Sequence, residues 1–369
     1  MPEDVRVIID RSDVGSVVES DGSGEEMKRE VTFALILWVS VFAFLELSVR
    51  AYDLMRGARK EDRVTTSNHV SIFSPHPYAA YVGNPRHDGH NAQGYRAAND
   101  RMFTGDPEVF NIACLGGSST YGTQVPLEDS YPHQLELALA GTPGPPVQVI
   151  NAGLGGSSTP NLIALLSGRV VHLRPRIVIF YTGFNDAWNR ILFPDYKADY
   201  SHAQKSWERP PMALWRHSRF LDLAAAKLGR PFSRDPHIHA VAWHPMGGDP
   251  AENWEDSSSI SFRVNLLTLV AITRAHGAVP VLVTQATDFA HHPMPAHNDL
   301  WARAMEEQTG ILRQVAGATG VDLIDVRAAM SDREELFADV LHMSATGNRR
   351  RAALIAAYLV EHGLVADAR

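Results

Sequence analysis

The chain has 369 residues, of which 45% are hydrophobic, so it can bury one large core and is expected to hold one α/β domain with extensions. Its formal net charge of -8 argues against a nucleic-acid partner, because that binding depends on clustered lysine and arginine. Its single cysteine, Cys114, excludes an intramolecular disulfide and lies in an apolar run that predicts a small buried side chain.

The N-terminal part of the chain has three sections. Residues 1–30 carry Asp, Glu, Ser and Gly without apolar periodicity, which predicts a mobile tail. Residues 31–49 are apolar with one carboxylate and approach the roughly 20 residues needed to cross a membrane. A long polar stretch precedes them and no small-x-small site follows, so we expect a transmembrane anchor rather than a cleaved signal peptide. The alternative for residues 31–49 is a buried helix of the globular domain. Residues 50–108 are expected to form a connector.

The remainder of the chain alternates apolar runs with amphipathic stretches of helix length. This is the pattern of a parallel sheet covered by helices on both faces. The predicted strands are residues 110–115, 147–151, 177–182, 280–285 and 322–326. We therefore expect a three-layer α/β/α domain over residues 109–369.

Glycine-rich or polar motifs stand at the ends of the first three strands. They are Gly116-Gly117-Ser118-Ser119, Asn151-Ala152-Gly153-Leu154-Gly155-Gly156 and Gly183-Phe184-Asn185-Asp186. Because ligands bind outside the carboxyl ends of parallel strands, we expect Ser118, Gly156 and Asn185 to meet at one edge of the sheet. A serine at a strand-to-helix junction is well placed to act as a nucleophile.

A fourth motif, Asp339-Val340-Leu341-His342, precedes an amphipathic helix expected over residues 350–362. Taken singly, a Gly-Gly-Ser-Ser run is typical of a turn, and Asn-Asp or Asp-x-x-His is typical of a turn or helix start. The four motifs in this order, at the ends of predicted strands, predict a hydrolase active site.

The ordered set resembles the four sequence blocks of the SGNH/GDSL hydrolase superfamily, over residues 91–364. The first block usually reads Gly-Asp-Ser-Leu, and here Gly117 stands in place of its aspartate. The residues that match the functional positions are Ser118 (nucleophile), Gly156 and Asn185 (oxyanion hole), and Asp339 and His342 (closing pair). The resemblance implies a flavodoxin-like sheet, a segment over residues 91–96 that packs near the site, and an extracytoplasmic catalytic domain. Ser119 is the alternative nucleophile.

These residue types suit ester chemistry. A serine hydroxyl needs an adjacent base, and His342 can take the proton of Ser118 and return it to the departing alcohol. Asp339 would hold the imidazole in one tautomer. The backbone N–H groups of Ser118 and Gly156 and the side-chain amide of Asn185 would donate to the tetrahedral oxyanion.

Residues from about 187 to 260 exceed one crossover helix and predict an insertion that walls the substrate pocket. Its tryptophans are Trp188, Trp207, Trp215, Trp243 and Trp254. For any single one of them the favoured role is packing of the insertion, and we expect at least one to line the pocket. Several histidines invite a metal interpretation, namely His237, His239, His244, His291 and His292. No Cys or carboxylate completes a familiar ligand spacing, so we expect no metal, and for His291 and His292 substrate contact is the more plausible function.

We therefore expect a single-pass membrane serine esterase that needs no cofactor. Its substrates would be carboxylic esters, with O-acetyl groups of carbohydrates as one class and lipid, thioester or aryl esters as others. Two alternatives stay open: an acyltransferase that uses the same triad to acylate a sugar, and a catalytically inactive surface-anchored binding module.

Overall fold

The computed structural model describes residues 23–57, 72–76, 78–203, 206–208, 218, 220–221, 224, 240–242 and 246–365. The chain divides into two compact units. One unit comprises residues 1–65 with 217–231, and the other comprises residues 66–216 with 232–369. Most of the predicted tail, residues 1–30, lies outside the described residues.

The first unit contains one long helix, α1 (Ser23–Gly57), which includes the predicted apolar segment and extends beyond it at both ends. Within this helix, Met27–Tyr52 has a mean hydropathy of 2.1 over its most apolar stretch. Its 26 residues exceed the roughly 20 that a membrane span requires. Helix α1 is therefore long and apolar enough to cross a membrane.

The carboxylate inside this apolar segment, Glu46, has donors within its own unit. It accepts hydrogen bonds from Arg50 Nε at 2.7 Å, Ser218 Oγ at 2.9 Å and the backbone N–H of Phe220 at 2.9 Å. Because an unpaired charge in an apolar environment is costly, these donors explain how α1 accommodates a glutamate.

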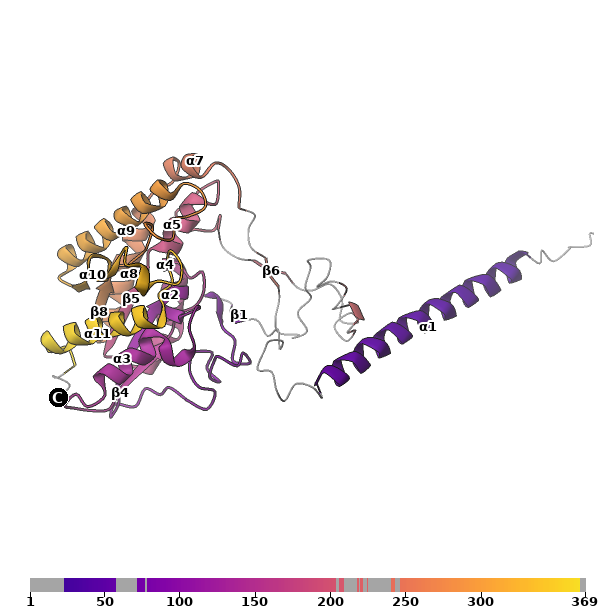
Figure 1. Ribbon diagram of the computed structural model, residues 1–369, viewed down its shortest axis with the longest axis horizontal. Helices are drawn as coiled ribbons and strands as arrows, with labels where there is room; N and C mark the ends of the chain where they lie inside the picture. The colour runs from indigo at the N-terminus through magenta and orange to yellow at the C-terminus, as the bar shows by residue number, and fades with distance from the viewer. Residues whose placement is uncertain are drawn as a thin grey trace, which may run out of the picture. The chain divides into compact units, whose positions relative to one another are not determined.

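The second unit is built on a five-stranded parallel sheet (Figure 1). Its strands are β3 (Phe110–Gly116), β4 (Val147–Asn151), β5 (Ile177–Tyr181), β8 (Val279–Val283) and β9 (Asp322–Ile324). Their order in the sheet, β4-β3-β5-β8-β9, is the flavodoxin-like order. The predicted fold class is confirmed.

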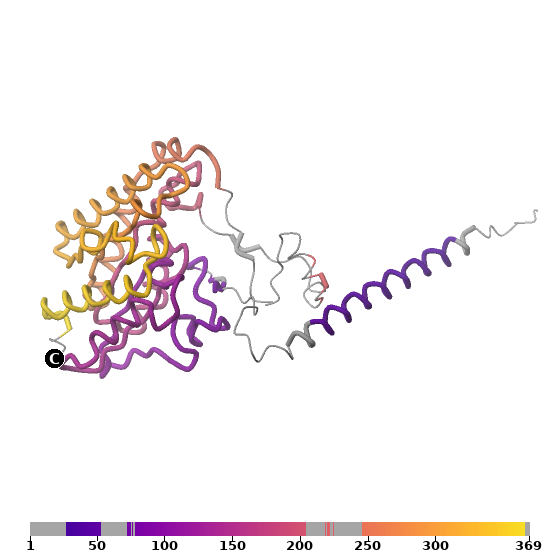
Figure 2. The backbone as a smooth tube through the Cα atoms, in the orientation of Figure 1, coloured from indigo at the N-terminus to yellow at the C-terminus, as the bar shows by residue number. Residues whose placement is uncertain are grey.

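Helices cover both faces of this sheet. Helices α3 (Tyr131–Leu139) and α11 (Ala345–Glu361) pack against each other on one face, and Figure 2 shows the C-terminal helix beside the α3 segment. Helices α4 (Thr159–Gly168), α8 (Ile260–Ala275) and α9 (Asn298–Thr319) cover the other. Side chains of a strand alternate between faces, so neighbouring residues of β3 contribute to different core clusters and all seven are buried.

The shorter elements lie at the edges of this framework. They are β1 (Phe73–His76), β2 (Ala80–Gly83), α2 (Ser118–Tyr121), α5 (Phe184–Ile191), β6 (Ser206–Glu208), β7 (Ala240–Ala242), α7 (Pro250–Glu255), α10 (Val326–Met330), and 3-10 turns at Leu127–Asp129, Val170–Leu173 and Glu334–Leu336. The antiparallel pairs β1-β2 and β6-β7 fall in the predicted connector and insertion, where the sequence indicated no strands.

The strand order determines where a site forms. The chain runs from β3 to β4 on one side and then crosses to β5 on the other side of β3. Gly116 at the end of β3 is paired in register with Tyr181 at the end of β5. A flavodoxin-like sheet binds its ligand at this point, where the strand order reverses.

Candidate active site

Ser118 begins the short helix α2 directly after β3, and its side chain is partly exposed. The two preceding glycines are closely packed. A Cβ at Gly116 would overlap the carbonyl oxygen of Tyr181, and one at Gly117 would overlap the side-chain nitrogen of Asn185. At Gly116 the neighbour is backbone, which cannot move aside, whereas at Gly117 it is the end of the Asn185 side chain.

A chain of hydrogen bonds joins Ser118 to the C-terminal motif, 224 residues later. The hydroxyl Oγ of Ser118 lies 2.7 Å from Nε2 of His342. The other ring nitrogen, Nδ1, lies 2.8 Å from Oδ2 and 3.0 Å from Oδ1 of Asp339. The predicted nucleophile, base and carboxylate are thus brought into direct contact.

The carboxylate of Asp339 is held ionised by its hydrogen bonds. Burial alone would raise its pKa, but the donors on His342 and Leu341 outweigh that effect and hold the pKa of Asp339 well below its usual range. Its Oδ1 accepts the backbone N–H groups of Leu341 at 2.9 Å and His342 at 2.7 Å. An ionised acceptor on Nδ1 favours the tautomer in which Nε2 is free to accept a proton.

Asn185 and the loop that carries Gly156 lie beside the same turn. The loop after β4 reaches it through a hydrogen bond from Leu154 N to Gly116 O at 3.1 Å, and Gly156 adopts a left-handed φ of 71°. Asn185 Nδ2 donates one hydrogen to Ser157 O at 2.8 Å, which leaves its second hydrogen for another acceptor. Within the described chain, the backbone N–H groups of Ser118 and Gly156 have no backbone acceptor.

Two buried side chains that the sequence analysis did not single out fix the turn that carries Asn185. Gln285 Oε1, just after β8, accepts the N–H of Phe184 at 2.9 Å. The fully buried Asp186 accepts the hydroxyl of Thr159 at 2.5 Å and its N–H at 3.1 Å. Burial raises the pKa of Asp186 to about 6, against the lowering effect of these hydrogen bonds. The place of Asp186 next to Asn185, shortly after an apolar run, was the available sequence signal.

A sequence profile of the GDSL-like Lipase/Acylhydrolase family matches residues 114–350, which span all four motifs. The chain belongs to this family. It is accordingly an ester hydrolase of the SGNH type. No curated protein matches the chain.

Several solved structures resemble this GDSL-like hydrolase. The lipase/acylhydrolase of Enterococcus faecalis has 20% identity and a TM-score of 0.43, covering 68% of this chain and 96% of its own. The acetylxylan esterase Axe2 of Geobacillus stearothermophilus has 18% identity and a TM-score of 0.42, covering 69% and 94%. A putative lipolytic protein of the G-D-S-L family from Desulfitobacterium hafniense has 13% identity and a TM-score of 0.41, covering 67% and 98%.

The segment before β3 packs against the nucleophile region of the hydrolase domain, as predicted for residues 91–96. The guanidinium of Arg96 donates to Gly122 O at 2.8 Å and Val125 O at 2.7 Å and lies 4.3 Å from the centre of the Tyr121 ring. In the β1-β2 hairpin, the hydroxyl of Tyr81 donates to Gly155 O at 3.4 Å. The connector thus supports both the turn after Ser118 and the glycine loop.

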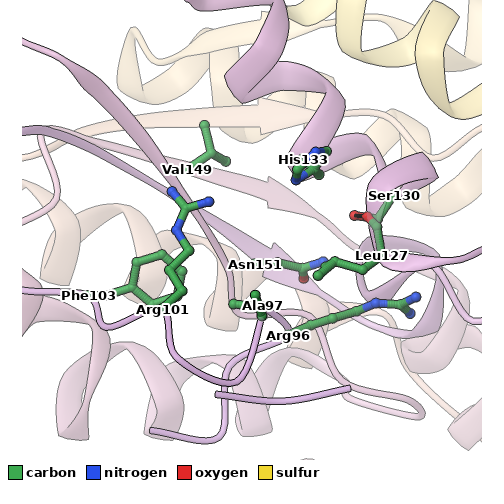
Figure 3. A pocket seen from close by; sticks show the side chains of 10 residues that line it. Arg96, Ala97, Arg101, Phe103, Leu127, Ser130, His133, Val149 and Asn151 are labelled. Carbon is green, nitrogen blue, oxygen red and sulfur yellow. Dashed lines mark hydrogen bonds between the residues drawn. The ribbon is translucent and has the colours of Figure 1, made fainter. Parts of the chain in front are cut away.

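A small pocket lies behind this region (Figure 3). Its lining includes Arg96, Arg101, Ser130, His133 and Asn151. Two polar side chains of its wall have partners within the protein. Arg101 forms an ion pair with Glu136 at 2.6 Å, and Ser130 Oγ donates a hydrogen bond to Leu127 O at 2.6 Å. Neither Ser118 nor His342 lines this pocket, so it is separate from the hydrolase site.

His291 and His292 flank the buried carboxylate of Asp288. Nδ1 of His291 lies 2.9 Å from Asp288 Oδ1, and this hydrogen bond raises the pKa of His291. The backbone N–H of Asp288 donates to Val340 O at 2.9 Å, which places this group beside the loop that carries His342. Substrate contact by these histidines stays a prediction.

The other predicted residues have varied placements. No group of three metal-ligating side chains occurs in the part of the chain that was described, and His237, His239 and His244 lie outside it. Cys114 is buried, as predicted, and burial raises the pKa of its thiol to about 12. Trp188 and Trp254 are partly buried in the cluster around α5 and α9. The structure does not describe the side chains of Trp207, Trp215 and Trp243.

Proposed function

We propose that this GDSL-like hydrolase is a serine esterase in which Ser118, His342 and Asp339 form the catalytic triad. The observation that carries the proposal is the continuous set of contacts, 2.7 Å from Ser118 Oγ to His342 Nε2 and 2.8 Å from His342 Nδ1 to Asp339 Oδ2. Both are hydrogen-bond distances: the first lets Nε2 take the proton of Ser118, and the second holds the imidazole in place.

In the proposed reaction, Ser118 Oγ attacks the ester carbonyl carbon while its proton passes to His342 Nε2. The tetrahedral intermediate collapses when the bond to the alcohol oxygen breaks, and that oxygen takes the proton from Nε2. Water then attacks the acyl-enzyme, gives its proton to Nε2, and releases the acid as the proton returns to Ser118. Asp339 stabilises the imidazolium throughout.

The oxyanion would be stabilised by the backbone N–H groups of Ser118 and Gly156 and by the amide of Asn185. The packing of the Asn185 amide against Gly117 supports this assignment, since it brings a neutral donor next to the nucleophile turn. In this proposal the three donors are fixed before substrate arrives, which is the condition for electrostatic stabilisation of the transition state.

We expect Asn185→Ala to lower kcat about 10²- to 10³-fold, the usual effect of losing one oxyanion donor. KM should change little, because the charge on the carbonyl oxygen develops only in the transition state. The measurement is steady-state hydrolysis of p-nitrophenyl acetate, with Asn189→Ala on the same helix as the control. A variant with unchanged kcat and raised KM would remove Asn185 from the oxyanion hole.

The proposal also makes α1 a single-pass membrane anchor with an extracytoplasmic catalytic domain. In support, α1 exposes large apolar side chains on all sides, with Phe33 70% and Trp38 74% exposed. A helix in water rarely exposes so continuous an apolar surface. Protease protection of sealed vesicles checks the side on which the domain lies.

As substrates we propose short acyl esters, with O-acetyl carbohydrate as the class to test first. Trp188 supports this choice because it lies one helical turn after Asn185 on α5 and is also partly exposed. An aromatic ring at that position could pack against the apolar face of a sugar.

The test uses the full chain in detergent. We expect stoichiometric labelling by a fluorophosphonate, faster hydrolysis of p-nitrophenyl acetate than of the decanoate, and release of acetate from an acetylated polysaccharide. Labelling together with faster acetyl transfer to an added sugar than to water would indicate the acyltransferase instead. Absence of both labelling and turnover would contradict the proposal and leave the binding module.

A further inference from the structure

Helix α11 buries a charged side chain under the active site. Arg351 has no exposed surface and is the largest fully buried side chain of the described residues. Its guanidinium carbon lies 4.1 Å from the ring centre of Tyr131 and 4.5 Å from that of Tyr181. No carboxylate among the described residues lies within ion-pair distance. Burying a charge without an ionic partner is costly, so this arginine needs a reason to be where it is.

The hydrogen bonds of Arg351 connect the nucleophile turn to the histidine loop. Nη2 donates to Ser119 O at 3.0 Å and to Asn348 Oδ1 at 2.5 Å. The amide nitrogen of Asn348 donates in turn to Met343 O at 3.1 Å. The path therefore starts at the residue after Ser118 and ends at the residue after His342.

Ser119 provides a second link between the same two segments. Its side chain is buried, with 5% exposed, and its Oγ donates to Leu341 O at 3.2 Å. The two paths thus hold the backbone on both sides of His342. Ser119, the alternative nucleophile of the sequence analysis, therefore has its hydroxyl bonded within this network.

We propose that Arg351 is a positioning residue that keeps Ser118 and His342 in register, with Ser119 as the second link; this inference rests on the proposed function. The two catalytic groups lie 224 residues apart and are joined directly by one hydrogen bond. A small displacement of either segment would lengthen that bond and slow proton transfer. Contact with Tyr181, the last residue of β5, extends the same support towards the turn of Asn185.

The test compares Arg351→Met with Arg349→Met, both in the full chain in detergent. Arg349 lies two residues earlier on α11, is 53% exposed, and pairs at the surface with Asp129. For Arg351→Met we expect kcat and the rate of fluorophosphonate labelling to fall roughly 10- to 100-fold, with KM and the final labelling stoichiometry unchanged. Arg351→Lys should recover part of the rate because it retains a cationic donor, and Arg349→Met should match the parent.

Ser119→Ala gives an independent test with a smaller change. Losing one neutral hydrogen bond should lower kcat by roughly 3- to 10-fold, while Ser118 is still labelled to completion. This variant decides the matter if Arg351→Met does not fold.

The proposal is overturned if Arg351→Met has a lower melting temperature than the parent but the same kcat and labelling rate. It is equally overturned if Arg351→Met does not fold and Ser119→Ala reacts at the parent's rate. Failure of the parent chain to be labelled at all contradicts the proposed function itself, which distinguishes the two failures.

Discussion

Replacing Ser118 with alanine is expected to lower kcat for ester hydrolysis by about 10⁴- to 10⁶-fold and to abolish fluorophosphonate labelling. The hydroxyl of Ser118 lies 2.7 Å from His342 Nε2, whereas that of Ser119 is turned towards Leu341 O. Among the described residues, the hydroxyl that hydrogen-bonds to His342 Nε2 is that of Ser118. The measurement is initial-rate hydrolysis of p-nitrophenyl acetate, together with mass spectrometry of the labelled peptide.

The matched control for this prediction is Ser119→Ala, which removes the neighbouring hydroxyl and leaves the nucleophile. It should be labelled at Ser118 and should lose only the modest rate expected of a positioning contact. Label recovered on Ser119 in the parent, or substantial turnover by Ser118→Ala, would show that Ser118 is not the nucleophile.

Asp339→Asn is expected to lower kcat about 10⁴-fold with little change in KM. The asparagine oxygen can still accept the backbone N–H groups of Leu341 and His342 that Asp339 Oδ1 accepts. Its NH₂ group would then face Nδ1 of His342, which must become an acceptor. The ring proton moves to Nε2, and the imidazole can no longer take the proton of Ser118.

The measurement is kcat with p-nitrophenyl acetate, and the control is Asp129→Asn, which alters a surface carboxylate paired with Arg349. Stability gives a second readout. The pKa of Asp339 is lowered in the folded chain, so its stabilising effect is present above the ordinary value of about 3.9 and is lost as the pH falls through the lowered value. The melting temperatures of parent and variant should therefore converge in acid. Near-normal kcat in Asp339→Asn would exclude the carboxylate from the triad.

The sequence by itself determined the fold class and the location of the site. Each of the five predicted strands is present, because a strand buried on both faces must be apolar along its length, and such runs are visible in the sequence. The motifs at the ends of β3, β4 and β5 converge because parallel strands place their carboxyl ends on one edge. The apolar span of α1 was also visible in the sequence, because its composition alone distinguishes it from the rest of the chain.

Only the tertiary structure decided how the site is held together. The amide of Asn185, which follows another strand, packs against Gly117. Asp186 bonds to the start of α4, and Arg351 joins two segments from opposite ends of the domain. None of these contacts has a local pattern, because each depends on residues that are far apart in the chain and near each other only once the sheet has formed. Local composition specifies strands and helices, whereas the geometry between Ser118 and His342 depends on packing that no segment contains alone.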